Sequence, residues 1–124
     1  MTEAISVPPV RGCVAVAVQE GEDLTATVGV HFGRAPRFLL VGRGVGEGVR
    51  ILENVHAEAT QGAGAATASL LAREGVTAAM AGQFGPRAEE ALRAGGILPI
   101  TVAPGTRAEA ALANLQAEML QTAD

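Results

Sequence analysis

The sequence predicts an α/β fold in which a mixed sheet is covered by helices on both faces. Its first half holds short apolar runs bounded by turn residues, which is typical of strands. Its second half alternates apolar runs with Ala-rich stretches whose apolar residues recur at helical spacing. Apolar residues make up 48% of the 124 residues, enough for a core without disulfides. Together these observations predict the element order β-β-β-α-β-α-β-α.

Three strands are expected in the first half of the chain. The first covers residues 12–18, where small and branched residues alternate, and a polar turn follows it at 19–23. The second strand covers 37–42 and the third covers 49–54. The turn between them contains three glycines, Gly44, Gly46 and Gly48. A short Gly-rich connection of this kind predicts an antiparallel hairpin.

The second half is expected to begin with a helix, a strand and a helix. The first helix covers 64–73 and ends before Gly75. A buried strand follows at 76–81. The next helix begins at Pro86, because proline is tolerated in a first helical turn, and it runs to Ala94.

A strand and a helix complete the chain. The strand covers 97–102, where Pro99 indicates an edge position. Thr106 and Glu109 have the spacing of a capping box and predict the start of the last helix. Five residues are expected to form its apolar face: Ala110, Leu112, Leu115, Met119 and Leu120. The predicted organisation is an extended tail over 1–10, which contains two prolines, and a single domain over 11–124.

Composition and charge argue against several classes of function. The formal net charge is −4 and no arginine cluster appears, so a nucleic-acid partner is not expected. No apolar run approaches the roughly 20 residues of a membrane span, and the amino terminus lacks a signal-peptide pattern. We therefore expect a cytoplasmic protein without a membrane partner. The single cysteine, Cys13, excludes an internal disulfide and a CxxC metal site.

The segment 31–38, HFGRAPRF, predicts a loop that carries binding residues. His31 and Arg34 stand beside a glycine and a proline, directly before the apolar run of the second strand. Loops anchored on rigid strands are where binding residues concentrate. Imidazole is the commonest neutral metal ligand, so His31 is the strongest single candidate, ahead of His56 and Cys13.

Two glycine turns before helices are the other candidate binding elements. Gly62 and Gly64 precede the first helix, where free backbone N–H groups favour an anion. Gly85 and Arg87 follow the strand at 76–81, and an arginine in a first helical turn suits an anionic ligand. Because ligands of open α/β sheets bind at the carboxyl ends of strands, these turns and the His31 loop are expected to share one cleft.

These motifs, taken in order, resemble the dinitrogenase iron-molybdenum cofactor biosynthesis domain family. They are HFGRAPRF at 31–38, GAG at 62–64 and AGQFGPRA at 81–88, and the similarity runs from about Cys13 to about Leu120. The resemblance implies an RNase H-like α/β/α domain with a five-stranded mixed sheet whose second strand is antiparallel. It also implies a non-enzymatic carrier that holds an anionic iron–sulfur precursor of the nitrogenase iron-molybdenum cofactor and passes it on. Its partners would be nitrogenase cofactor biosynthesis proteins as cluster donor and acceptor, and the carrier a monomer or weak homodimer.

The same resemblance implies roles for individual residues. His31 would be the metal ligand, while Arg34 and Arg87 would neutralise cluster charge together with backbone amides at four glycines, Gly33, Gly62, Gly64 and Gly85. The chain departs from the family at Gln61, where members often have a histidine, and no cysteine lies in the motif loops. With so few protein ligands, the cluster would be bound transiently.

The residues also leave another class of function open. A small regulatory or interaction module would bind a phosphate or nucleotide anion at the glycine turns, and would depend more on Arg87 than on His31. Dinucleotide binding is disfavoured because Thr67 stands where the third glycine of GxGxxG belongs. An enzyme ranks third among these classes of function, because neither Ser6 nor Ser69 lies in a nucleophile elbow.

Overall fold

The computed structural model describes residues 12–42 and 48–122, and its elements follow the predicted order. The predicted tail at 1–10 and the glycines at 44 and 46 lie outside the described residues. No strand boundary differs from the predicted one by more than two residues. The elements are β1 (Cys13–Val18), β2 (Arg37–Gly42), β3 (Arg50–Glu53), α1 (Ala63–Arg73), β4 (Ala78–Ala81), α2 (Pro86–Ala94), β5 (Leu98–Thr101) and α3 (Ala108–Thr122).

The five strands form one mixed sheet in the order β3-β2-β1-β4-β5. β2 is antiparallel to both of its neighbours, β1 and β3. β4 pairs in parallel with β1 and with β5. The predicted mixed sheet with an antiparallel second strand is therefore confirmed, and so is the antiparallel pairing of β2 with β3. Pro99 lies in β5, at an edge of the sheet as predicted, where its missing N–H removes no ladder hydrogen bond.

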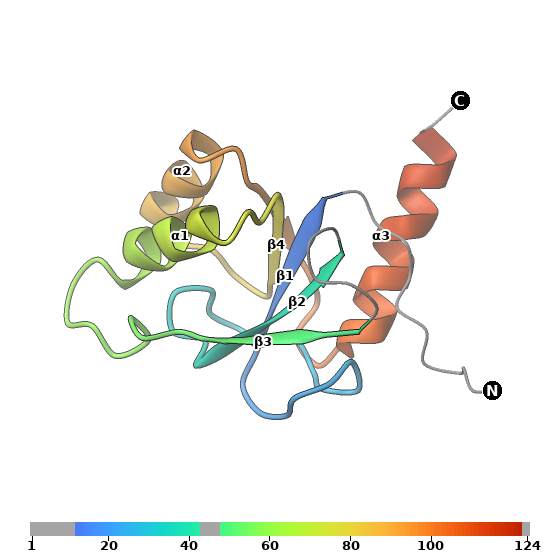
Figure 1. Cartoon of the computed structure of the whole chain (residues 1–124), viewed down its shortest axis with the longest axis horizontal. Helices are drawn as coiled ribbons and strands as arrows, with labels where there is room; N and C mark the ends of the chain where they lie inside the picture. The colour runs from blue at the N-terminus through green and yellow to red at the C-terminus, as the bar shows by residue number, and fades with distance from the viewer. Residues whose placement is uncertain (1–11, 43–47, 123–124) are drawn as a thin grey trace.

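Helices cover both faces of the sheet, with α1 and α2 on one side and α3 on the other (Figure 1). Every side chain of β1 is buried because successive residues of this central strand face opposite helical layers. Its small residues at 13, 15 and 17 pack with α1 and α2. Its valines at 14, 16 and 18 pack with α3. The alternation of small and branched residues in the sequence thus corresponds to two different layers.

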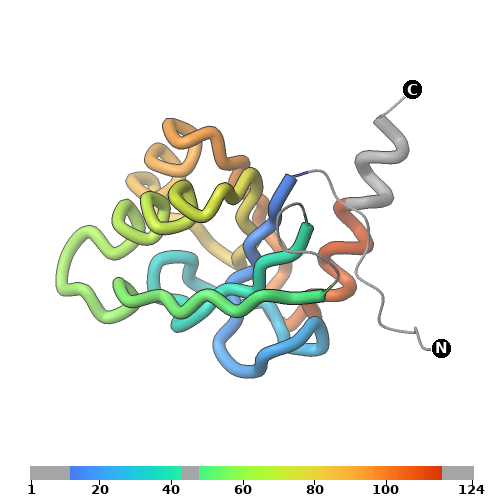
Figure 2. The backbone as a smooth tube through the Cα atoms, viewed as in Figure 1, coloured from blue at the N-terminus to red at the C-terminus, as the bar shows by residue number. Residues whose placement is uncertain are grey.

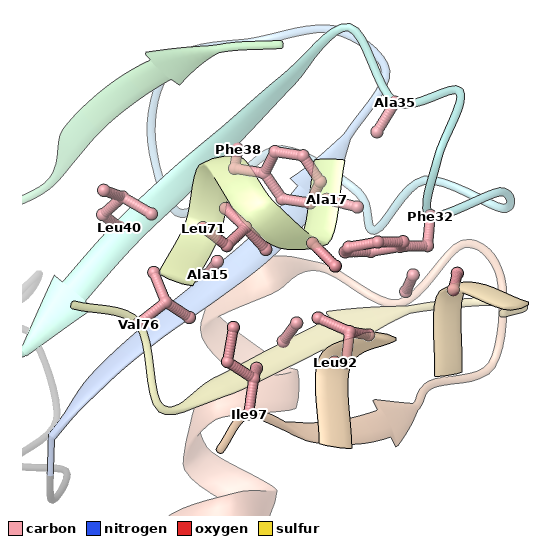
Figure 3. Packing of buried hydrophobic residues seen from close by; sticks show 14 of the residues in the cluster. Ala15, Ala17, Phe32, Ala35, Phe38, Leu40, Leu71, Val76, Leu92 and Ile97 are labelled. Atoms are coloured by element: carbon pink, nitrogen blue, oxygen red, sulfur yellow. The ribbon is translucent and has the colours of Figure 1, made fainter. Parts of the chain in front are cut away.

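The layer under α1 and α2 contains the aromatic part of the core (Figure 3). Phe32 and Phe38 are both buried, and their ring centroids lie 5.5 Å apart. Leu71 of α1 and Leu92 of α2 are fully buried in the same cluster. Phe38 belongs to β2, whereas Phe32 lies in the segment before it, so this core also anchors the predicted binding loop.

The start of α3 differs from the prediction. Instead of closing a capping box with Thr106, the N–H of Glu109 donates to the carbonyl of Leu24 at 2.9 Å. The N–H of Ala108 donates to the carbonyl of Ala26 at 2.8 Å. A loop distant in the sequence therefore supplies the acceptors that a local cap supplies in other helices.

The predicted apolar face of α3 is correct in part. Leu112 is fully buried and Leu115 is half-buried, whereas Ala110 is exposed, which corrects its assignment to the core. Met119 and Leu120 lie outside the residues whose side chains are described. Within the described ranges, no helix has both the length and the hydropathy that crossing a membrane requires.

Candidate functional site

One pocket of about 680 Å³ is lined by all three of the predicted binding segments. Residues 31–34 and the first turns of α1 and α2 line it. Figure 2 shows the course of the backbone through the chain. The structure places all seven predicted site residues in its lining: His31, Gly33, Arg34, Gly62, Gly64, Gly85 and Arg87. Segments that are about 50 residues apart in the chain meet here because β1, β3 and β4 all point to this edge of the sheet.

Backbone hydrogen bonds join the His31 loop to the turn before α2. The N–H of Phe32 donates to the carbonyl of Gln83 at 3.0 Å, and His31 and Gln83 form a parallel bridge. Next to it, the N–H of Gly82 donates to the carbonyl of Gly29 at 2.9 Å. The side chain of His31 is exposed, but its backbone is therefore held in a fixed place on the pocket wall.

Close backbone packing joins the same loop to α1. A Cβ atom on Gly33 would lie 2.9 Å from both the N and Cα atoms of Gly64. A Cβ atom on Gly64 would lie 2.7 Å from the Cβ of Ala88 in α2. The sequence predicted that these glycines open the backbone to a ligand. The structure adds a second reason for them, since the loop and the two helices pack too closely for side chains.

Two helix amino termini point into the pocket. α1 begins after Gly62, and its first intrahelical hydrogen bond runs from the N–H of Ala66 to Gly62 at 2.9 Å. α2 begins after Gly85, and its corresponding bond runs from Glu89 to Gly85 at 2.9 Å. Neither helix in this described part of the chain has a side-chain cap. The free N–H groups and partial positive charges of both helices therefore face one volume, which favours an anion.

The two arginines in the pocket lining, Arg34 and Arg87, make its charge positive. His31, Arg34 and Arg87 are exposed on its wall, and no acidic side chain is among the described lining residues. Arg34 also has structural partners: one of its guanidinium nitrogens donates to the carbonyls of Ala59 at 2.6 Å and Ala57 at 3.0 Å. Arg34 thus ties the 57–59 segment to the His31 loop, a contact that the sequence did not reveal.

A buried polar residue that the sequence did not single out, Asn54, lies beside the His31 loop. Asn54 was assigned to the end of the third strand, but it follows β3 and is 6% exposed. Its side chain hydrogen-bonds to the carbonyls of Gly33 and Ala35 in the His31 loop. The available signal was an asparagine between a strand and a turn, where such residues commonly bond to backbone groups.

The other candidate metal ligands lie elsewhere. Cys13 begins β1, whereas the pocket lies beyond the opposite end of that strand, so its sulfur is not a ligand of this site. His56 is half-buried and is not among the lining residues. No group of three or more His, Cys, Asp or Glu side chains among the described residues could hold a metal ion. The pocket offers one imidazole surrounded by hydrogen-bond donors and positive charge.

We expect Cys13 to react with alkylating reagents only at more alkaline pH than an unfolded cysteine does. Burial raises the pKa of its thiol, Arg50 offsets part of this increase, and Glu74 adds to it. Because the thiolate is the nucleophile, a raised pKa lowers the reactive fraction at every pH below it. The check is the rate of iodoacetamide labelling against pH, for the native chain and for the chain in urea. Coincident profiles would contradict the burial of this thiol.

Comparisons with known proteins identify one family and solved structures with a similar fold. The sequence matches a family model described as dinitrogenase iron-molybdenum cofactor over residues 12–118. The apo form of the orange protein from Desulfovibrio gigas is 28% identical with a TM-score of 0.79, covering 86% of this chain and 88% of that chain. A candidate NifB protein from Thermotoga, solved by NMR, is 29% identical with a TM-score of 0.67 and the same two coverages. A search of curated proteins finds no match.

Proposed function

This chain belongs to the dinitrogenase iron-molybdenum cofactor family, and from that premise we propose that it carries an anionic iron–sulfur precursor of the cofactor. The cargo binds in the pocket at the starts of α1 and α2. Cofactor biosynthesis proteins deliver it and take it away, and the carrier does not change it chemically. Family membership supports a cofactor-related carrier role, while the site and the cargo are our proposal.

The observation that carries this proposal is the convergence of two uncapped helix amino termini with His31, Arg34 and Arg87. Metal–sulfur clusters are anionic, and proteins stabilise them by hydrogen bonds to sulfur and by nearby positive charge. In this pocket the backbone N–H groups supply the hydrogen bonds and the arginines supply the charge. The imidazole of His31 is the one side chain in the lining that can bind a metal directly.

The scarcity of ligands supports carriage rather than permanent storage. Clusters that stay bound are ordinarily held by several thiolates. The lining residues include no cysteine and one histidine. A cargo held by one imidazole, by amide hydrogen bonds and by charge exchanges readily, because each exposed contact contributes little. Release to an acceptor then needs only the replacement of one protein ligand.

We expect His31→Ala to weaken binding of the isolated precursor cluster by about tenfold or more, the equivalent of ~1.4 kcal/mol, because it removes the direct metal ligand. Arg87→Gln is expected to weaken binding about two- to fivefold, because an exposed charge at a helix start contributes ~0.3–1 kcal/mol. The measurement is anaerobic titration followed by gel filtration, with iron and protein quantified in each fraction.

Two variants serve as matched controls. Arg73→Gln removes the same charge from the far end of α1, and Cys13→Ala removes the single thiol. Both are expected to bind as the unmodified chain does. No retention of the cluster by the unmodified chain would overturn the proposed function. Equal retention by His31→Ala would overturn the role of His31 as the ligand.

A second candidate function rests on the same helix termini, which bind phosphate groups as readily as other anions. A regulatory or interaction module of this kind would bind inorganic phosphate or a nucleotide. The same variants distinguish the two. A nucleotide would raise the melting temperature, and Arg87→Gln would reduce that rise more than His31→Ala. The carrier hypothesis requires His31→Ala to weaken cluster binding more than Arg87→Gln does.

A further inference from the structure

A buried asparagine connects the separate walls of the pocket. We infer that Asn54 is the positioning residue of this site: it holds the His31 loop against the first turns of α1 in the geometry that binds the anion. The inference rests on the proposed function for its ligand. The hydrogen bonds that support it all lie within the chain and involve no ligand.

Asn54 and Thr67 are the two buried polar side chains of the described residues, exposed by 6% and 0%. They contact one another: the hydroxyl of Thr67 donates to Oδ1 of Asn54 at 3.3 Å. Thr67 lies on α1, one turn after the helix start that faces the pocket. A buried polar pair is costly unless it is satisfied, so the location of its partners indicates what it stabilises.

All the hydrogen-bonding capacity of the Asn54 amide is used. Of its four partners, Gly33 lines the pocket, Ala35 lies in the same loop, Thr67 lies on α1, and His56 lies outside the lining. Nδ2 donates to the carbonyl of Ala35 at 2.9 Å and to that of Gly33 at 3.4 Å. Oδ1 accepts from the N–H of His56 at 3.1 Å, in addition to the hydroxyl of Thr67. An asparagine amide has two donors and one oxygen with two lone pairs, so it is fully satisfied here.

The backbone of Asn54 strengthens the same connections. Its N–H donates to the carbonyl of Pro36 at 2.9 Å, and its carbonyl accepts from the N–H of Ala57 at 3.2 Å. Ala57 in turn accepts from the guanidinium of Arg34. Asn54 therefore contacts the His31 loop directly, α1 through Thr67 and Arg34 through Ala57. These contacts set how far His31 and Arg34 stand from the amides of α1.

The effect on binding follows from this geometry. Gly33 lies against the backbone of Gly64, so a small shift of the loop moves the His31 side of the pocket relative to the helix start. Hydrogen bonds to a shared ligand tolerate little change in distance or angle. Loss of the Asn54 amide is expected to leave His31, Arg34 and Arg87 in the chain but no longer correctly placed together.

The test compares the unmodified chain, Asn54→Ala and Thr67→Val, all in the full-length protein. Each substitution is neutral, so a change in affinity for an anion does not come from added charge. The probe is a synthetic, thiolate-ligated 4Fe–4S cluster dianion under anaerobic conditions. We expect binding at least tenfold weaker for Asn54→Ala and at least threefold weaker for Thr67→Val, after correction for any unfolded fraction. Thr67→Ser keeps the hydroxyl and is expected to restore the affinity.

Leu112→Ala is the control for stability alone. It creates a cavity under α3, on the other face of the sheet, and is expected to destabilise the chain without changing the dissociation constant of the folded fraction. An affinity loss in Leu112→Ala equal to that in Asn54→Ala would overturn the inference. So would unchanged affinity in both Asn54→Ala and Thr67→Val.

A second measurement separates this inference from the proposed function. The measurement is NMR on the protein without added cluster. The backbone amide signals of His31, Gly33 and Gly64 and the imidazole signals of His31 are expected to shift in Asn54→Ala and Thr67→Val. In Thr67→Ser they are expected to keep the positions they have in the unmodified chain. If the unmodified chain does not bind the cluster but these shifts occur, the proposed function is wrong and the positioning role stands. If the cluster binds and these signals do not move, the positioning role is wrong.

Discussion

Replacement of Phe32 by alanine is expected to lower the free energy of unfolding by about 3–5 kcal/mol. Phe32 is 1% exposed and lies beside Phe38 in the core (Figure 3). Its ring centroid is 5.5 Å from that of Phe38 and 5.2 Å from that of Phe84. The substitution removes a large buried ring and leaves a cavity between the sheet and the two helices that cover it. Natural domains of this size are stable by only ~5–15 kcal/mol, so the loss is a large fraction of the total.

Urea unfolding followed by far-ultraviolet circular dichroism measures this effect. Phe84→Ala is the matched control, because Phe84 packs against the same cluster but is only half-buried. Phe84→Ala is expected to lower the free energy of unfolding by less than Phe32→Ala does. Equal losses for the two variants, or a loss below about 1 kcal/mol for Phe32→Ala, would contradict the role of Phe32 as the anchor of the His31 loop.

Substitution of Gly33 by alanine is expected to lower the free energy of unfolding by about 1–3 kcal/mol, because the added methyl group meets backbone atoms that cannot rotate away. The new Cβ would lie 2.9 Å from the N and Cα atoms of Gly64, so the loop and α1 have to separate. Separation also displaces the wall that carries His31. Affinity for the anionic probe is therefore expected to fall together with stability.

Gly85→Ala provides the control within the same pocket. Gly85 has a φ of −72°, which any residue adopts, and nothing lies within 4 Å of its added Cβ. This variant is expected to be neutral or stabilised by ~0.4–1 kcal/mol, since alanine restricts the unfolded chain. Thermal unfolding and probe titration of both variants check the pair. A stable, fully binding Gly33→Ala would be inconsistent with the close approach of the loop to α1.

Much of the fold could be predicted because its signals are local. Pro86 begins α2, and the apolar runs become strands within two residues of their expected ends. The alternation of strands and helices then limits the sheet to few topologies, because crossovers between parallel strands have one hand. The same logic placed the three binding segments at one edge of the sheet before any contact was known.

The details of the site could not be predicted from local sequence. The capping box expected at Thr106 is locally sound, but the carbonyl of Leu24 binds the N–H of Glu109 that this box would use. Arg34 was expected to neutralise the charge of the anion together with Arg87, and its guanidinium also binds the carbonyls of Ala57 and Ala59. Both outcomes depend on segments more than 20 residues distant in the chain.

The sequence by itself determined the order of elements, the two apolar layers and the identity of the residues around the pocket, because periodicity, turn residues and helix signals act over a few neighbouring positions. Only the tertiary structure decided how those residues are held. Gly33 and Gly64 approach each other, and Asn54 satisfies four partners, because the chain packs three distant segments together. Such contacts have no local pattern, since a hydrogen bond between distant residues depends on their positions after folding.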